Sequence, residues 1–214
     1  MLRVHAICYY RDEDAGWPAA WRRSDLQAHD LIEALRRNEP QGLYEFPRGV
    51  GRQATPSDIY DGTTTAMDYA SRMLAKAIIA AGYDAATVIP IPSTTHTRPG
   101  SDFLGRRIAK AIEDRNPRFR NTPVLYFARP LPGRAQGGGR TPTAIRINLR
   151  STSLRGLHRA ILIDDVATTG AHLKAAAAYL WEKGVRVEDA FVVARVAPRP
   201  MDNMFDVPIT RIKL

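Results

Sequence analysis

The stretch from Ala160 to Leu173 constrains the fold of this chain more than any other. It reads A-I-L-I-D-D-V-A-T-T-G-A-H-L, so a short apolar run ends in two adjacent carboxylates, and small and hydroxyl residues precede an alanine-rich segment. This order is typical of a buried strand that turns directly into a helix. In open α/β sheets, ligands bind at the carboxyl ends of such strands. The stretch therefore predicts a strand–loop–helix unit with a binding site at its turn.

The residue types in this turn favour a phosphorylated sugar as the ligand. Asp164 and Asp165 would hold sugar hydroxyls or a metal ion, and Thr168, Thr169 and Gly170 would cradle one phosphate at a helix N-terminus. The plainer alternative is a buried strand that ends in a solvated acidic turn. The motif G-x-x-x-x-G-K-[ST] is absent, and no G-x-G-x-x-G opens a helix after a strand. These absences argue against a nucleotide triphosphatase and a dinucleotide enzyme.

Strand-like and helix-like segments alternate along most of the chain. This alternation predicts an α/β fold, a parallel sheet with helices on both faces. We expect a small N-terminal appendage at 1–60, a core at 61–197 and a C-terminal tail at 198–214. The expected strands are 4–10, 43–46, 87–92, 123–128, 144–149, 160–164 and 189–196, and the expected helices are 24–37 after a Ser24 cap, 63–81, 102–115 after an Asp102 cap, and 171–183.

Composition restricts the class of protein. Cys8 is the only cysteine, which excludes an internal disulfide and a cysteine-cluster zinc site. No N-terminal signal segment is visible, and no apolar run approaches the roughly 18 residues of a membrane span. We expect a cytoplasmic protein with no membrane partner.

The positive charge is confined to one segment. Between Arg98 and Arg150, twelve Arg or Lys stand against three Asp or Glu, and this excess equals the formal net charge of +9 of the whole chain. Such a segment predicts an anionic partner: polyphosphate, nucleic acid or an acidic surface. For Arg106, Arg107 and Lys110, a solvated helix face is an equally good interpretation.

Two loops carry candidate anion ligands. Ser93, Thr94 and Arg98 lie in a hydroxyl-rich loop that can bind pyrophosphate, or that is an ordinary polar loop. The second loop runs from Arg129 to Arg140 as R-P-L-P-G-R-A-Q-G-G-G-R. Its three consecutive glycines predict mobility.

Residues 161–170 resemble the ribose-phosphate signature of the type I phosphoribosyltransferases, an apolar run followed by Asp-Asp-x-x-Thr-Thr-Gly, and the resemblance extends over about 60–197. The run V-I-P-I-P at 88–92, Arg98, the arginine-rich loop and the pair at 194–195 further resemble the ComF-like branch, which is associated with DNA uptake. The chain departs from that branch in having no cysteine-rich zinc segment and a looser loop after Pro92.

The resemblance implies a magnesium-dependent phosphoribosyltransferase that moves the phosphoribosyl group of phosphoribosyl pyrophosphate to a nitrogenous acceptor. It implies that Asp164 and Asp165 take the ribose hydroxyls and steady the developing cation. The Mg²⁺ would be held mainly by pyrophosphate, ribose oxygens and water. The remaining implied roles are the 5′-phosphate cradle at Val166, Ala167, Thr168, Thr169 and Gly170, the pyrophosphate contacts at Ser93, Thr94 and Arg98, and neutralisation of the leaving group by Arg134 and Arg140 on a closing loop.

Several alternatives stay open at this point. Relatives commonly have threonine where this chain has His172, so either the phosphate site is altered or the imidazole points outward. The acceptor is undetermined, and residues 1–60 and the tail are candidates for a hood over it. The second class of function is a non-catalytic protein of the ComF type that senses phosphoribosyl pyrophosphate or associates with nucleic acid. A homodimer is also compatible with the sequence.

Overall fold

The computed structural model describes residues 1–11, 20–38, 44–47, 65–132 and 141–214. Its elements in chain order are β1 Leu2–Tyr10, α1 Arg23–Arg37, α2 Ala66–Ala80, β2 Ala86–Pro90, α3 Leu104–Arg115, β3 Phe119–Asn121, β4 Leu125–Phe127, α4 Pro142–Asn148, β5 Leu149–Ser151, β6 Arg159–Ala167, α5 Ala171–Glu182, β7 Arg186–Val196 and β8 Thr210–Ile212.

A six-stranded sheet forms the centre of the molecule, in the order β3-β2-β6-β7-β1-β8. All neighbouring strands in it run parallel except β8, which runs antiparallel to β1 at one edge. Strands β4 and β5 form a separate antiparallel pair. The predicted α/β fold with a largely parallel sheet is therefore confirmed.

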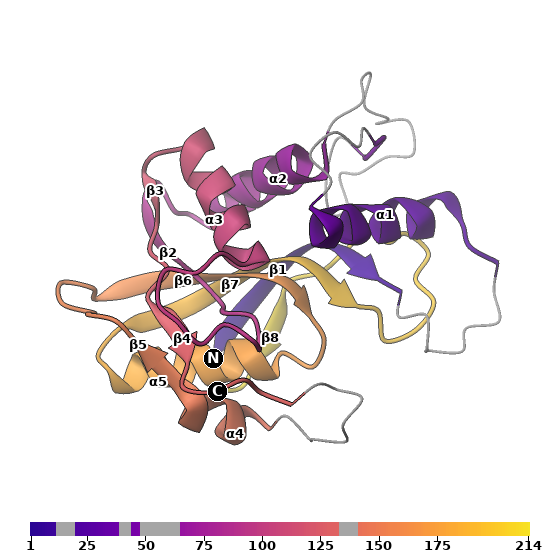
Figure 1. Ribbon diagram of the computed structural model, residues 1–214. Helices are drawn as coiled ribbons and strands as arrows, with labels where there is room; N and C mark the ends of the chain where they lie inside the picture. The colour runs from indigo at the N-terminus through magenta and orange to yellow at the C-terminus, as the bar shows by residue number, and fades with distance from the viewer. Residues whose placement is uncertain (12–19, 39–43, 48–64, 133–140) are drawn as a thin grey trace.

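The side-chain alternation of β6 shows why helices cover both faces. Ile161 and Ile163 point into one buried cluster, which α1, α2 and α3 complete. Ala160 and Leu162 point into a second cluster on the opposite face, with α4 and α5. Successive residues of a strand face opposite sides, so a run that is apolar at every position requires cover on both. Figure 1 shows the two helical layers above and below the sheet.

The predicted strand at 144–149 is wrong, because most of it is helix α4. Thr141 caps this helix by accepting a hydrogen bond from the Ala144 N–H, and Pro142 occupies the first turn. Only Leu149 belongs to a strand, β5. The short helix buries Ile145 and leaves Ile147 exposed, a pattern that looks like strand alternation in the sequence.

Other predicted elements differ in position. The segment predicted at 123–128 is the short strand β4, which lies outside the central sheet. Of the strand expected at 43–46, the described part shows only an isolated bridge residue at Tyr44. Helix α1 begins after Arg22, whose backbone N–H donates to Asp25 Oδ2, so Ser24 is not its cap. Helix α3 follows Phe103 rather than Asp102.

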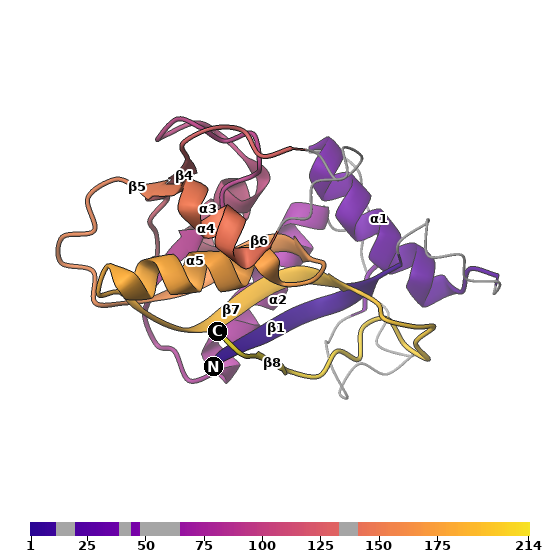
Figure 2. The same ribbon diagram turned by 90° about the horizontal axis from the view of Figure 1, so that it is seen from below.

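Both segments that flank the expected core contribute to the central sheet. Strand β1 lies inside it, between β7 and β8, and β8 comes from the tail. The two chain ends consequently lie close together (Figure 2). The proposed boundaries at 60 and 197 stay predictions. Among the described residues, no helix is both long enough and apolar enough to cross a bilayer.

A buried carboxylate on β7 links this strand to β1 and to the turn that precedes β2. Asp189 is fully buried and accepts hydrogen bonds from Arg3 Nε and Nη2 at 2.8 and 2.6 Å and from the Tyr83 hydroxyl at 2.5 Å. His5 Nε2 lies 2.8 Å from Asp189 Oδ1. Burial by itself would raise the pKa of Asp189, but hydrogen bonds from His5, Arg3 and Tyr83 hold it below its ordinary value. The ionised carboxylate thus stabilises the fold.

We expect Asp189→Asn to lower the free energy of unfolding by about 3 kcal/mol, because it breaks a buried ion pair. Urea denaturation at pH 7 measures the loss. A folded-state pKa below the unfolded one means that this contribution is present above about pH 4 and disappears as the pH falls. The matched control is Glu188→Gln, which removes the partly exposed neighbouring carboxylate and should cost under about 1 kcal/mol. Equal losses in the two variants would contradict the assignment.

Candidate functional site

The loops that follow β2 and β6 meet in one pocket at the carboxyl edge of the sheet. Pro90 of β2 lies opposite Ile163 of β6, and the Ile91 N–H donates to the Ile163 carbonyl at 2.8 Å. The residues that follow on each strand are therefore adjacent. The pocket has a volume of ≈ 390 Å³ and is lined by Arg36, Ile91, Pro92, Ser93, Thr94, Asp164, Asp165, Val166, Thr168 and His172.

The acidic pair lies within β6, because the strand continues to Ala167 rather than ending at Asp164. Asp164 is paired with Val192 of β7, and the Asp165 N–H donates to Asp164 Oδ1 at 3.0 Å. Burial and the neighbouring Asp165 charge raise the pKa of Asp164 well above its ordinary value. The pair is therefore suited to bind hydroxyl groups or a cation, both of which relieve the repulsion.

The predicted phosphate cradle is the turn between β6 and α5. Gly170 is the N-cap of α5 with φ of 72°, a left-handed conformation that favours glycine. Thr169 Oγ1 lies 3.4 Å from the Ala171 N–H. Thr168 lines the pocket, whereas Ala167, Thr169 and Gly170 do not. The turn therefore presents a hydroxyl and a helix N-terminus beside the acidic pair.

The hydroxyl loop after β2 reaches the same pocket through Ser93 and Thr94. The Ser93 carbonyl accepts the His96 N–H at 2.9 Å, which closes the loop into a turn. Arg98 is exposed and does not line the pocket. Arg134 and Arg140 lie outside the described residues, so their expected role and that of Arg98 stay predictions.

The structure adds Arg36 to the pocket and decides where His172 lies. Arg36 comes from the last turn of α1, where its Nη1 donates to Glu33 Oε1 at 3.0 Å and its guanidinium lies 5.3 Å from the centre of the Tyr10 ring. The sequence contains no signal for this, since nothing in it fixes how α1 crosses the sheet. His172 also lines the pocket, which favours an altered phosphate site over an outward-pointing imidazole.

The donor set fits the magnesium ion that the sequence resemblance implies. The pocket offers the carboxylate oxygens of Asp164 and Asp165 and the hydroxyls of Ser93, Thr94 and Thr168. Mg²⁺ prefers oxygen ligands and is usually held by one or two carboxylates together with substrate phosphates and water. Within the described ranges, no group of three or more His, Cys, Asp or Glu side chains is arranged to hold a metal.

No family model matches the sequence, and no curated protein matches it. Solved structures that resemble the fold include two phosphoribosyltransferases. One is an adenine phosphoribosyltransferase with 14% identity and a TM-score of 0.39, covering 78% of this chain and 89% of that chain. The other, an adenine phosphoribosyltransferase from Leishmania donovani, has 11% identity and a TM-score of 0.37, covering 80% of this chain and 84% of that one.

We expect Asp164→Asn to raise the melting temperature at pH 7 by about 2 °C or more. A carboxyl group whose folded-state pKa is raised destabilises the fold as the pH increases past its unfolded-state pKa near 4, and asparagine removes that term. Scanning calorimetry from pH 4 to 8 should show a flatter profile for the variant. Asp114→Asn, which removes an exposed carboxylate on α3, is the control. A variant that melts below the wild type would indicate a structural role for Asp164.

Gly170→Ala should destabilise the protein more than Gly184→Ala. Both glycines have left-handed φ angles, 72° and 81°, so both substitutions cost about 1 kcal/mol. A Cβ at Gly170 would also lie 2.7 Å from Ile212 Cδ1, whereas a Cβ at Gly184 meets nothing within 4 Å. Ile212→Val removes that carbon, so it should abolish the excess loss in the double variant. An excess that persists in the double variant, measured by urea unfolding, would contradict this explanation.

Proposed function

We propose that this chain binds phosphoribosyl pyrophosphate with Mg²⁺ in the pocket at the carboxyl edge and transfers the phosphoribosyl group to a nitrogenous acceptor. In this reaction the bond from the ribose C1 to the pyrophosphate oxygen breaks, and a bond from C1 to the acceptor nitrogen forms. The acceptor nitrogen loses a proton, and pyrophosphate leaves. The observation that carries the proposal is the meeting of the acidic pair, the Thr168 turn and the hydroxyl loop in one pocket.

Each part of the pocket matches one part of this ligand. Asp164 and Asp165 would accept hydrogen bonds from the ribose 2′ and 3′ hydroxyls. Their negative charge would also favour the oxocarbenium-like state, in which positive charge develops on the sugar. The 5′-phosphate would lie against Thr168 and the first N–H groups of α5, where the helix dipole favours an anion. Holding both ends of the sugar orients C1 for attack.

The hydroxyl loop and Arg36 would stabilise the negative charge that develops on the departing pyrophosphate. Ser93 and Thr94 line the same pocket as the acidic pair and would offer hydroxyl donors to pyrophosphate. Bound Mg²⁺ would neutralise charge on the leaving group. Arg36 reaches the pocket from the last turn of α1, so it can contact either the acceptor or the pyrophosphate. Arg134 and Arg140 remain further candidates for that contact.

A non-catalytic sensor of phosphoribosyl pyrophosphate is the alternative, and it would use the same pocket. Ligand binding alone therefore does not distinguish the two functions. Turnover distinguishes them, because only the transferase releases pyrophosphate when an acceptor is present. A screen of purine, pyrimidine and other nitrogenous acceptors with a pyrophosphate-release assay addresses this point.

We expect the double substitution Asp164→Asn with Asp165→Asn to weaken phosphoribosyl pyrophosphate binding at least tenfold. Charge-assisted hydrogen bonds contribute about 1.5–3 kcal/mol each, and about 1.4 kcal/mol corresponds to a factor of ten. Isothermal titration calorimetry with Mg²⁺ measures the affinity. The control is Glu113→Gln with Asp114→Asn, which removes two adjacent carboxylates on α3 away from the pocket. Unchanged affinity in the folded site variant, or no binding by the wild type, would refute the proposal.

A further inference from the structure

A second pocket lies at the opposite, amino edge of the central sheet. It is formed where β2, β3 and β6 begin, has a volume of ≈ 330 Å³, and contains no acidic lining residue. Its lining includes Arg118 just before β3, Arg120 within β3, Arg159 at the start of β6, Thr87 on β2, and Tyr83. The length of β2 separates this pocket from the candidate site, because Thr87 lies near the start of β2 and Ser93 lies in the loop after its end.

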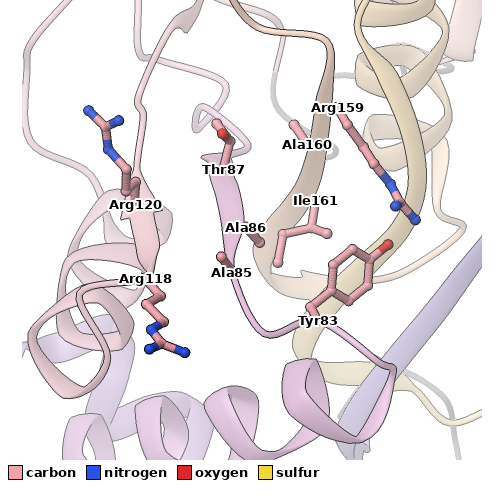
Figure 3. A pocket seen from close by; sticks show the side chains of 9 residues that line it. All are labelled: Tyr83, Ala85, Ala86, Thr87, Arg118, Arg120, Arg159, Ala160 and Ile161. Carbon is pink, nitrogen blue, oxygen red and sulfur yellow. The ribbon is translucent and has the colours of Figure 1, made fainter.

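The arginines come from both sides of β2. Figure 3 shows Arg118 and Arg120 on the β3 side and Arg159 on the β6 side, with Arg159 extending toward Tyr83. The Arg159 guanidinium lies 5.2 Å from the centre of the Tyr83 ring, and its Nη2 donates to Glu188 Oε2 at 2.9 Å. The Tyr83 ring is itself fixed, since its hydroxyl donates to buried Asp189. Arg159 is therefore positioned from two sides, and its remaining N–H groups are left for a ligand.

Arg118 and Arg120 differ from most cations of the basic segment 98–150. Within the described ranges, no hydrogen bond or ion pair involves either guanidinium, and both residues are exposed. Most other cations in that segment are engaged by protein groups: Arg106 with the Gly100 and Ser101 carbonyls, Arg107 with Asp102, Lys110 with Asp114, Arg115 with Ser71 and Asp68, Arg129 with Asn148, Arg146 with Glu182, and Arg150 with the Ile147 and Leu149 carbonyls.

We propose that this arginine pocket, defined by Arg118, Arg120, Arg159, Thr87 and Tyr83, is a binding site for a phosphate group. Arginine matches phosphate oxygens with its planar fork of donors, and Thr87 adds a hydroxyl. Small side chains at Ala86 and on the neighbouring turn keep the pocket floor open. The phosphate can belong to a small phosphorylated molecule or to a nucleic-acid backbone, and the two sources are separated by experiment.

Helix electrostatics offer a purely structural explanation for the same arginines. Helix α3 ends at Arg115, three residues before Arg118, and cations near a helix C-terminus are stabilising. That explanation predicts a loss of stability in arginine variants with no effect on anion binding. The two explanations therefore make opposite predictions for one measurement.

The test is a site-resolved NMR titration of the isotope-labelled full chain with inorganic pyrophosphate, without Mg²⁺. The amides of Ala86, Thr87, Arg120 and Ile161 report on the arginine pocket. The amides of Thr168 and Gly170 report separately on the candidate site. Binding at the arginine pocket can therefore be detected even when the candidate site binds nothing. A parallel titration uses an oligothymidylate of about twelve nucleotides, within the range of single-strand binding sites.

We expect the arginine-pocket amides to shift with at least one probe. Arg118→Ala and Arg159→Ala should each weaken the binding of that probe at least about threefold, because each removes an exposed charge. Arg199→Ala removes an exposed charge just after β7, near the carboxyl edge of the sheet, and should leave the affinity unchanged. Shifts with pyrophosphate indicate a small phosphorylated ligand, and shifts with the oligonucleotide alone indicate a phosphodiester backbone. Unmoved amides with both probes, or arginine variants that lose stability but bind normally, would overturn the proposal.

Discussion

The pairing of β2 with β6 is the constraint on which the rest of the structure depends. Val88 lies opposite Ile161 and Pro90 opposite Ile163, so both strands end at the same edge and begin at the same edge. This single register brings the hydroxyl loop to the acidic pair, although the two are separated by some seventy residues in sequence. A slip of one residue would exchange the faces of β6 and remove Ile161 and Ile163 from the cluster under α1, α2 and α3. Core packing therefore fixes the geometry of the candidate site.

The partly buried acidic pair and the fully buried Asp189 show two opposite uses of a carboxylate. Asp189 is surrounded by donors, which hold its pKa low and make its charge stabilising. Asp164 has another carboxylate beside it, and its pKa is raised. Unlike Asp189, Asp164 pairs with no cation among the described residues, so a bound ligand or cation would favour its charged form. Perturbed carboxyl groups of this kind are typical of functional sites. The contrast is the main electrostatic argument that the pocket at the carboxyl edge binds a ligand.

The sequence predicted the α/β class and the nucleus of the candidate site because these depend on local patterns. The run from Ala160 to Gly170 contains a strand, an acidic pair and a helix start in one continuous stretch. The parts that failed depend on tertiary context. The segment 144–149 has alternating apolar residues, but a Thr-Pro start and contacts with α5 make it a helix. Arg36 was missed because its place in the pocket follows from the crossing of α1 over the sheet. Strand β1 was assigned to an appendage because its parallel pairing with β7 leaves no local signal in the sequence.

The two edges of the sheet offer different kinds of contact to an anion. Helices α3 and α5 begin near the carboxyl edge, after β2 and β6, and the N-terminus of α5 offers backbone N–H groups with a favourable dipole. Helices α2, α3 and α5 end near the amino edge, just before β2, β3 and β7, so their dipoles disfavour an anion there. An anion site at the amino edge must therefore be built from side-chain charge. The arginine pocket has that composition, with three arginines and no acidic lining residue. It follows that binding at the amino edge should depend strongly on single arginines and on salt, whereas binding at the carboxyl edge rests partly on the backbone and should tolerate more side-chain change.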